Sequence, residues 1–244
     1  MNTKKLIGVI LLAAVVLSIT GCAPPCPEVS GIDNRLRHYD KPATAYTPVP
    51  SYPSYQPSTS SVKGKTILID AGHGGKDPGT LGIKLGSSLG TPEKNINLDV
   101  AKKVAAKLSS MGANVRLTRS NDTFIELDDR AALVGRYRAD IFVSIHADYI
   151  GDSSISGPSC YIARQSTTQS RKIADSIIRQ FEKNGIKTRG VRKANYRVLV
   201  KHPKPATLVE VGYLSNYREA RALNSSSYRS KVASIIADGI ANSF

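Results

Sequence analysis

Two histidines and two glutamates stand where the sequence predicts that strands and helices begin or end. His73 and His146 each follow an apolar, β-branched run, Glu210 lies within a third such run, and Glu93 opens a helical pattern. Two imidazoles and a carboxylate, with one position left for water, are a usual ligand set of catalytic zinc. A further carboxylate nearby can act as general base. The four residues therefore indicate a metal-dependent hydrolase.

Each of these residues also has a purely structural explanation. A single histidine after a strand is commonly a hydrogen-bonded loop residue, and a glutamate at a helix N-terminus is favoured by the helix dipole. Glu210 is harder to explain in this way, because burying a carboxylate without a partner is costly. The glycine-rich loop around His73 does not fit the phosphate-binding pattern GxxxxGK[ST], since Lys76 is followed by Asp77.

Alternating apolar runs and helical patterns predict the elements that position the four residues. The predicted strands lie at 66–70, 114–118, 140–146, 160–163, 196–200 and 207–211. The predicted helices lie at 93–111, at 127–137, around 173–181 and around 232–240. This alternation predicts a single α/β domain with a mostly parallel, twisted sheet and helices on both faces. In such sheets, sites gather where strands end.

The N-terminal residues predict export and a lipid anchor. Two lysines precede an apolar run that ends at Ile19, which is shorter than the roughly 20 residues of a membrane-spanning helix and is typical of a signal peptide. Ile19-Thr20-Gly21-Cys22 resembles the bacterial lipobox, which implies cleavage after residue 21 and acylation of Cys22. Ala23 after this cysteine points to the outer membrane. We therefore expect the protein to lie in the periplasm, with its lipid anchor in the inner leaflet of the outer membrane. A plain signal peptide with an incidental cysteine is the alternative.

A proline-rich segment separates the predicted anchor from the predicted domain. Residues 23–60 hold eight of the thirteen prolines, a density at which neither helix nor strand persists. We therefore divide the chain into a signal peptide at 1–21, a linker at 22–62 and a catalytic domain at 63–244. The net charge of +15 favours attraction to a polyanion such as an acidic wall polymer. Export and the lack of a recognisable reader motif argue against nucleic acid.

Several local sequences together resemble the zinc-dependent N-acetylmuramoyl-L-alanine amidases of the type 3 family, in the family's order and over residues 64–243. They are Ile69-Asp-Ala-Gly-His-Gly-Gly-Lys-Asp-Pro-Gly79, Glu93-Lys-Asn-Ile-Asn-Leu98, Val115-Arg-Leu-Thr-Arg119, Phe142-Val-Ser-Ile-His-Ala147 and Val209-Glu-Val-Gly-Tyr-Leu-Ser-Asn216. The resemblance implies cleavage of the peptidoglycan amide bond between N-acetylmuramic acid and L-alanine, in cell-wall remodelling and daughter-cell separation. It also implies that His73, Glu93 and His146 bind Zn²⁺ and that Glu210 is the catalytic acid–base residue.

The same family resemblance raises the question of regulation. Many relatives carry an inhibitory helix between the second histidine and the catalytic glutamate. Here the elements predicted between His146 and Glu210 use most of the intervening residues, so we expect an open groove and a monomer that is active alone; a protein activator is the alternative. Two other functions stay open: a non-catalytic peptidoglycan-binding lipoprotein, and a zinc peptidase that cuts within the stem peptide.

Overall fold

The sheet is built around β1 (Thr66–Ala71), whose apolar residues are almost all buried. The computed structural model describes residues 61–244. The predicted signal peptide, Cys22 and residues 23–60 of the predicted linker lie outside the described residues, so these assignments remain predictions. Within 61–244, none of the helices combines the length and apolar character needed to cross a membrane.

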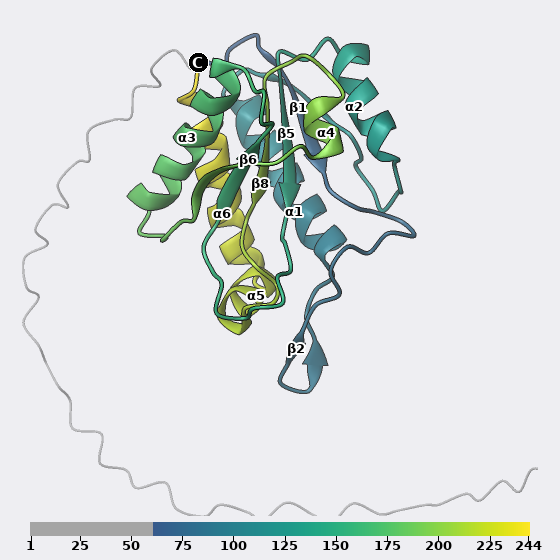
Figure 1. Ribbon diagram of the computed structural model, residues 1–244, viewed down its shortest axis with the longest axis vertical. Helices are drawn as coiled ribbons and strands as arrows, with labels where there is room; N and C mark the ends of the chain where they lie inside the picture. Colours follow the sequence, from purple (N-terminus) through teal and green to yellow (C-terminus); the bar gives the residue numbers. More distant parts are fainter. Residues whose placement is uncertain (1–60) are drawn as a thin grey trace, which may run out of the picture. The chain divides into compact units, whose positions relative to one another are not determined.

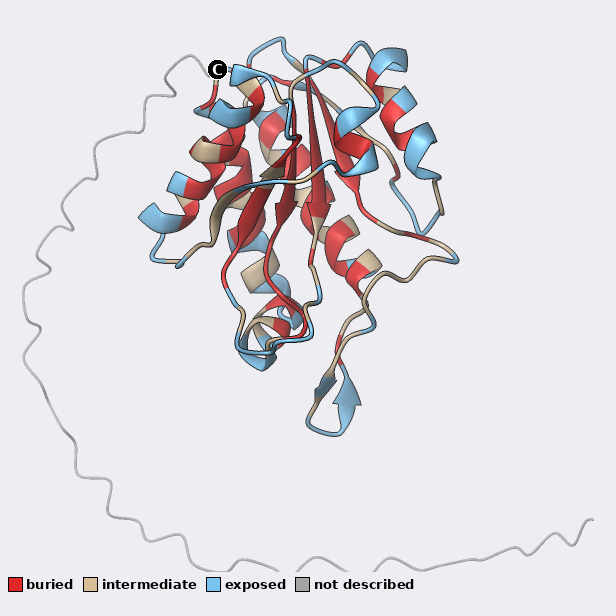
Figure 2. Cartoon of the chain, viewed as in Figure 1, coloured by how far each residue is buried: buried red, intermediate tan, exposed pale blue. Residues whose placement is uncertain are grey.

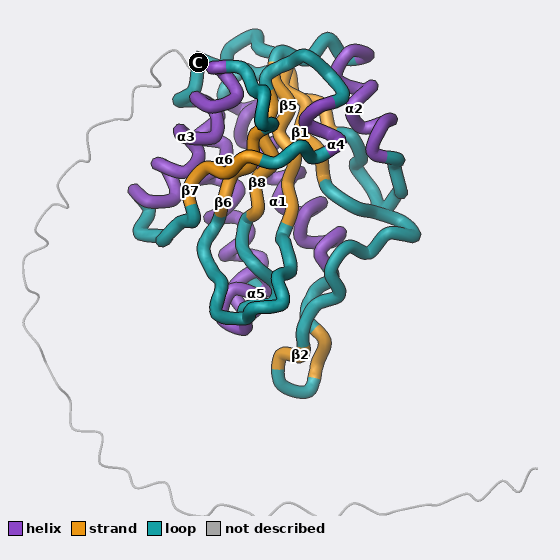
Figure 3. The backbone as a smooth tube through the Cα atoms, in the orientation of Figure 1, coloured by secondary structure: helices purple, strands orange, loops and turns teal. Residues whose placement is uncertain are grey.

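Six strands form one sheet, and Figure 3 shows them in orange between two sets of helices. Their spatial order is β4 (Asn114–Leu117), β1, β5 (Ile141–His146), β8 (Ala206–Glu210), β6 (Ser159–Ile162) and β7 (Gly190–Lys193). The first four strands are parallel, β6 runs antiparallel to β8, and β7 is parallel to β6. The predicted α/β class with a mostly parallel sheet is therefore confirmed.

Helices cover both faces of this sheet, as the sequence predicted (Figure 1). One face carries α1 (Glu93–Ser110), α3 (Thr168–Lys183) and α6 (Ser226–Ala241), which pack on each other and on the strands, with α5 (Tyr217–Asn224) against α6. The other face carries α2 (Leu127–Arg136) and the single turn α4 (Arg197–Val200). Figure 2 shows the buried strands between the two layers, which explains why their sequences are apolar on both sides.

Strand alternation decides which face each site residue occupies. Successive side chains of a strand point to opposite faces. In β1 and β5, Ile69 and Val143 belong to the core under α1 and α6, whereas Leu68 and Phe142 belong to the smaller core under α2 and α4. Positions 70, 144, 146, 208 and 210 therefore face α2 and α4. The two parallel pairings bring Asp70 beside Ser144 and His146 beside Glu210, although the residues of each pair are far apart in the chain.

One predicted strand is wrong. Residues 196–200 form the helical turn α4 instead, with the backbone N–H groups of Leu199 and Val200 both donating to the carbonyl of Tyr196. Val198 and Leu199 are consecutive and both buried, while Val200 is 46% exposed, so burial does not alternate as it does in a strand. A short apolar run does not distinguish a strand from a helical turn by its periodicity.

Three short elements were not predicted. They are β7, α5 and a two-stranded hairpin of β2 (Lys84–Leu85) and β3 (Ser88–Leu89), which projects from the body at the lower end of Figure 1. β7 carries a single large apolar residue, Val191, and the hairpin strands are two residues long. Neither β7 nor the hairpin therefore has enough apolar positions to show the two-residue period of a strand.

The described chain starts at the end of the sheet opposite the predicted site. Ser61 donates a hydrogen bond to the carbonyl of Ala241, and the ammonium of Lys65 lies 5.6 Å from the ring centroid of Phe244. These contacts lie beside the first residues of β1, β5 and β8, which run from this end toward the site. Cys160 has no exposed surface in β6.

Candidate active site

The residues predicted from the sequence converge at the ends of β1, β5 and β8. His73 follows β1 by two residues, His146 is the last residue of β5, and Glu210 is the last residue of β8. Glu93 is the first residue of α1, and its preceding residue, Pro92, sets the start of that helix because proline is tolerated there and lacks an N–H that would need a partner. The structure thus brings all four residues to one end of the sheet.

Glu93 lies between the two histidines. Its Oε1 atom is 3.2 Å from Nε2 of His73 and 3.1 Å from Nδ1 of His146. The two rings meet edge to face, with centroids 4.9 Å apart. The ligand atoms of the three residues all lie within 4.8 Å of one another, so one metal ion can contact all of them. The histidine side chains keep 24% and 19% of their surface exposed, which leaves a side of the cluster open.

Hydrogen bonds fix the orientation of the Glu93 carboxylate. Oε2 accepts from the backbone N–H of Thr80, and Oε1 accepts from Ala147 N–H and from the side-chain amide of Asn97. Burial opposes ionisation of this carboxyl, but the hydrogen bonds and charges of the two histidines outweigh burial and hold the pKa of Glu93 well below its usual range. The carboxylate is therefore ionised and is a ready ligand for a cation.

Asp77 orients the His73 ring. Its Oδ2 atom lies 2.7 Å from Nδ1 of His73, and its Oδ1 atom accepts from Gly79 N–H. A carboxylate that accepts a hydrogen bond from one ring N–H leaves the other nitrogen free as a metal ligand and fixes its direction. Burial opposes protonation of His73, but Glu93 and Asp77 outweigh it and raise the pKa of the ring. Asp77 was not predicted as a site residue. Its position four residues after His73 in the same loop is the signal in the sequence that could have identified it.

Glu210 lies beside the cluster without belonging to it. The residue is 5% exposed, and its Oε2 atom has no hydrogen-bond partner within residues 61–244. Burial, reinforced by the negative charges of Asp148 and Glu93, raises the pKa of Glu210 well above its usual value. A carboxyl in this state exchanges protons closer to neutral pH than an exposed glutamate does, as a general acid–base group must.

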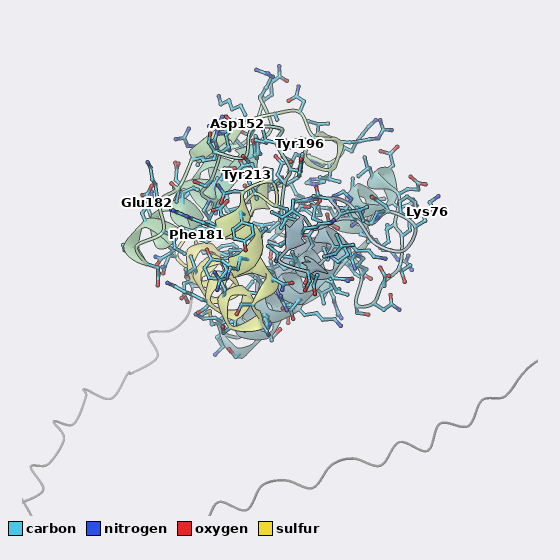
Figure 4. The ribbon with its side chains drawn as sticks, turned by 90° about the horizontal axis from the view of Figure 1, so that it is seen from below. Lys76, Asp152, Phe181, Glu182, Tyr196 and Tyr213 are labelled. Carbon is cyan, nitrogen blue, oxygen red and sulfur yellow. The ribbon has the colours of Figure 1, made fainter. Side chains whose placement is uncertain are left out.

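A cavity of about 760 Å³ opens onto these residues. It is lined on one side by His73, Glu93, His146 and Glu210, and on the other by the start of α2, by α4 and by Tyr196, which directly precedes α4. Figure 4 views the molecule from the end at which β1, β5 and β8 finish and labels Tyr196 there. Asp148, two residues after His146, also lines this cavity and was not predicted. Its burial raises the pKa of its carboxyl, and this effect is only partly offset by the hydrogen bond from Tyr149 N–H.

Comparisons with known proteins agree with this geometry. The family described as N-acetylmuramoyl-L-alanine amidase matches residues 67–242. The probable cell wall amidase LytH of Staphylococcus epidermidis is 36% identical over 77% of this chain, and the chain spans only 61% of the length of that relative. The catalytic domain of CwlV, an amidase from Bacillus (Paenibacillus) polymyxa, is 40% identical, with a TM-score of 0.66 over 73% of this chain and 97% of the other.

A third similar protein was solved together with a partner. The CwlD amidase of Clostridioides difficile, in complex with the GerS lipoprotein, is 29% identical to this chain, with a TM-score of 0.68 over 73% of this chain and 98% of the other. The family match extends over most of the chain and includes all four predicted site residues, His73, Glu93, His146 and Glu210. This chain therefore belongs to the N-acetylmuramoyl-L-alanine amidase family.

Proposed function

We propose that this protein hydrolyses the amide bond between N-acetylmuramic acid and L-alanine in peptidoglycan. The observation that carries the proposal is the placement of Glu210, a buried carboxyl with a free oxygen, beside a cluster of two imidazoles and a carboxylate in an open cavity. A binding protein gains nothing from an unpartnered buried carboxyl, which costs stability. Membership of the amidase family supports the identity of the bond.

We propose that the ion held by His73, Glu93 and His146 is zinc. Three ligands that each lie 2.0–2.1 Å from a tetrahedral ion are separated by about 3.3 Å. The distances from Glu93 Oε1 to the two histidine nitrogens, 3.2 and 3.1 Å, fit this spacing. When bound, zinc would polarise the carbonyl of the amide to be cleaved and lower the pKa of a bound water.

The protein's own residues then have two tasks. Glu210 removes a proton from the attacking water as the C–O bond forms, and it passes that proton to the nitrogen of the departing alanine as the C–N bond breaks. Its raised pKa suits both steps, because the carboxyl must accept and release a proton near neutral pH. Asp77 keeps the proton of His73 on Nδ1, and the wall of α2 and α4 contacts the peptidoglycan.

Product analysis tests this function and separates it from the two alternatives. Purified sacculi would be digested with the protein, with and without a chelator, and the soluble products analysed by mass spectrometry. The expected products are intact stem peptides with a free L-alanine amine and glycan without peptide, formed only when metal is present. A shortened peptide still attached to sugar would identify a peptidase instead, and binding without any product would identify a non-catalytic lipoprotein.

We also propose that the protein acts outside the cytoplasm on a lipid anchor at Cys22, at the periplasmic face of the outer membrane. The support is the lipobox-like sequence, together with the cell wall role stated in the name of the LytH relative. Metabolic labelling with an alkynyl fatty acid tests the anchor. Label should enter the wild-type protein and not Cys22→Ser, whereas Cys26→Ser should be labelled normally. Equal labelling of wild type and Cys22→Ser would refute the anchor.

A further inference from the structure

Two buried arginines hold the loop that carries His73. The carbonyl of Ala71 accepts from Nε of Arg119 at 2.9 Å and from Nη1 of Arg130 at 2.7 Å. The carbonyl of Gly72 accepts from Nη2 of Arg119 at 2.8 Å, and the carbonyl of His73 accepts from Nη2 of Arg130 at 2.7 Å. Three consecutive carbonyls at the end of β1 and directly after it are thus bound by two guanidinium groups that come from 47 to 59 residues further along the chain.

Arg130 is itself fixed from the opposite side. Its side chain is 3% exposed and pairs with the buried carboxylate of Asp70 at 2.8 Å. Asp70 also accepts hydrogen bonds from Ser144 of β5 and from Thr118, the residue directly after β4. Burial opposes ionisation of Asp70, but Arg130 and these two hydroxyls outweigh it and lower the pKa of the carboxyl. The guanidinium therefore has one orientation, which is set by three neighbouring strands.

The backbone of His73 needs such support. Its φ angle is +62°, in the left-handed region that residues with a Cβ atom rarely adopt. A residue in this region persists only where the surrounding structure imposes it. The bond from Arg130 to the His73 carbonyl acts on this residue directly, while Asp77 acts only on its ring.

We infer that Arg130 is a positioning residue that sets the metal affinity of the site by holding His73 in its left-handed backbone conformation. The inference rests on the proposed metal site. Arg130 touches neither the ligand atoms of His73, Glu93 and His146 nor the reacting bond. Its effect passes through the carbonyl of His73, from which the direction of the imidazole follows.

The test compares Arg130→Met with a matched variant, Arg229→Met. Arg229 is also largely buried, pairs with a carboxylate, that of Asp99, and donates to two backbone carbonyls, at Leu223 and Asn224, but it lies away from the cavity. Zinc affinity of the purified full chain would be measured by competition with a chromogenic chelator, and folding by circular dichroism and metal-free Tm. Both variants should lower Tm. Only Arg130→Met should weaken zinc binding, by about 10- to 100-fold, as for other partners of metal ligands.

A conservative variant keeps the inference testable if Arg130→Met fails to fold. Lysine at position 130 retains the charge beside Asp70 but lacks the planar fork that reaches two carbonyls at once. Arg130→Lys should therefore fold and still bind zinc more weakly than wild type. Wild-type zinc affinity in a folded Arg130→Met or Arg130→Lys protein, or an equal loss in Arg229→Met, would overturn the inference. Failure of the wild type itself to bind zinc would instead overturn the proposed metal site.

Discussion

At the scale of single residues, the carboxyl groups of the cavity are separated into two kinds by their surroundings. Glu93 is surrounded by donors and by two imidazoles, which stabilise its charge. Glu210 is buried and lies near the carboxylates of Asp148 and Glu93, and both conditions destabilise its charge. The two glutamates are the same chemical group, so the difference in protonation comes from position alone. One is suited to bind a cation and the other to transfer a proton.

Replacing Glu210 by glutamine should abolish most of the activity while leaving the metal bound. Glutamine has nearly the same volume but does not take up a proton, so we expect kcat to fall by about 100- to 10,000-fold. Release of stem peptides and zinc content would be measured on the same sample. Glu219→Gln is the matched control, because Glu219 is likewise mostly buried with a raised pKa but binds the N–H groups of Gly157 and Tyr213 outside the cavity. Full turnover by Glu210→Gln would remove its assigned role.

Asp70 should make the protein sensitive to acid. Its pKa is lowered in the folded state, so the unfolded chain binds its proton at a higher pH than the folded chain does. The stability that this carboxylate contributes is present above its unfolded pKa of about 4 and is lost as the pH falls through the folded value. Urea unfolding at a series of acidic pH values should show this loss. In Asp70→Asn, stability should be lower at neutral pH and should fall less steeply in acid; an unchanged slope would contradict the prediction.

At the scale of elements, the strands that carry the site residues were the elements predicted best from the sequence. β1, β5 and β8 are buried on both faces, so each reads as an apolar run that stops at a polar residue. Spacing alone did not decide which glutamate is a ligand; only the family resemblance did, and the structure puts Glu93 rather than Glu210 between the histidines. The contacts of Arg119 and Arg130 were not predictable, because each joins parts of the chain more than 40 residues apart.

The crossing of α3 and α6 should be intolerant of added volume. A Cβ atom built on Gly239 of α6 would lie 2.6 Å from the Cα atom of Ile177 in α3. Gly239→Ala should therefore force the helices apart and lower the free energy of unfolding by about 1–3 kcal/mol. In α2, Gly135 has open space around it, and Gly135→Ala should instead add up to about 1 kcal/mol through helix propensity. Denaturant titration of both variants gives the comparison, and equal effects would refute it.

At the scale of the whole molecule, the segment between His146 and Glu210 leaves the cavity open. Its two helices have other partners: α3 packs on α6 and β6, and α4 packs on α2 and β8. Within residues 61–244, α3 does not line the cavity and α4 forms part of its wall, while the two histidines retain exposed surface. We therefore expect the protein to be active without a partner, even though the CwlD relative was solved together with a lipoprotein.

Activity of the purified protein alone tests this expectation. Stem-peptide release from sacculi should proceed at a rate that does not rise when extract from the same cell envelope is added. The matched sample is Glu210→Gln in the same extract, which corrects for amidases that the extract itself contains. Negligible release until extract is supplied would show that an activator is required.

Ser61 and the cavity lie at opposite ends of the strands that carry the site. β1, β5 and β8 start beside Ser61 and end at the cavity, so their length separates the point of attachment from the reacting groups. At about 3.3 Å per residue, the six residues of β1 account for roughly 20 Å of this separation. An attachment made directly at residue 61 would therefore leave the opening of the cavity on the side of the domain that faces away from the support. For the same reason, immobilising the protein through residue 61 on a bead should leave substrate access unobstructed.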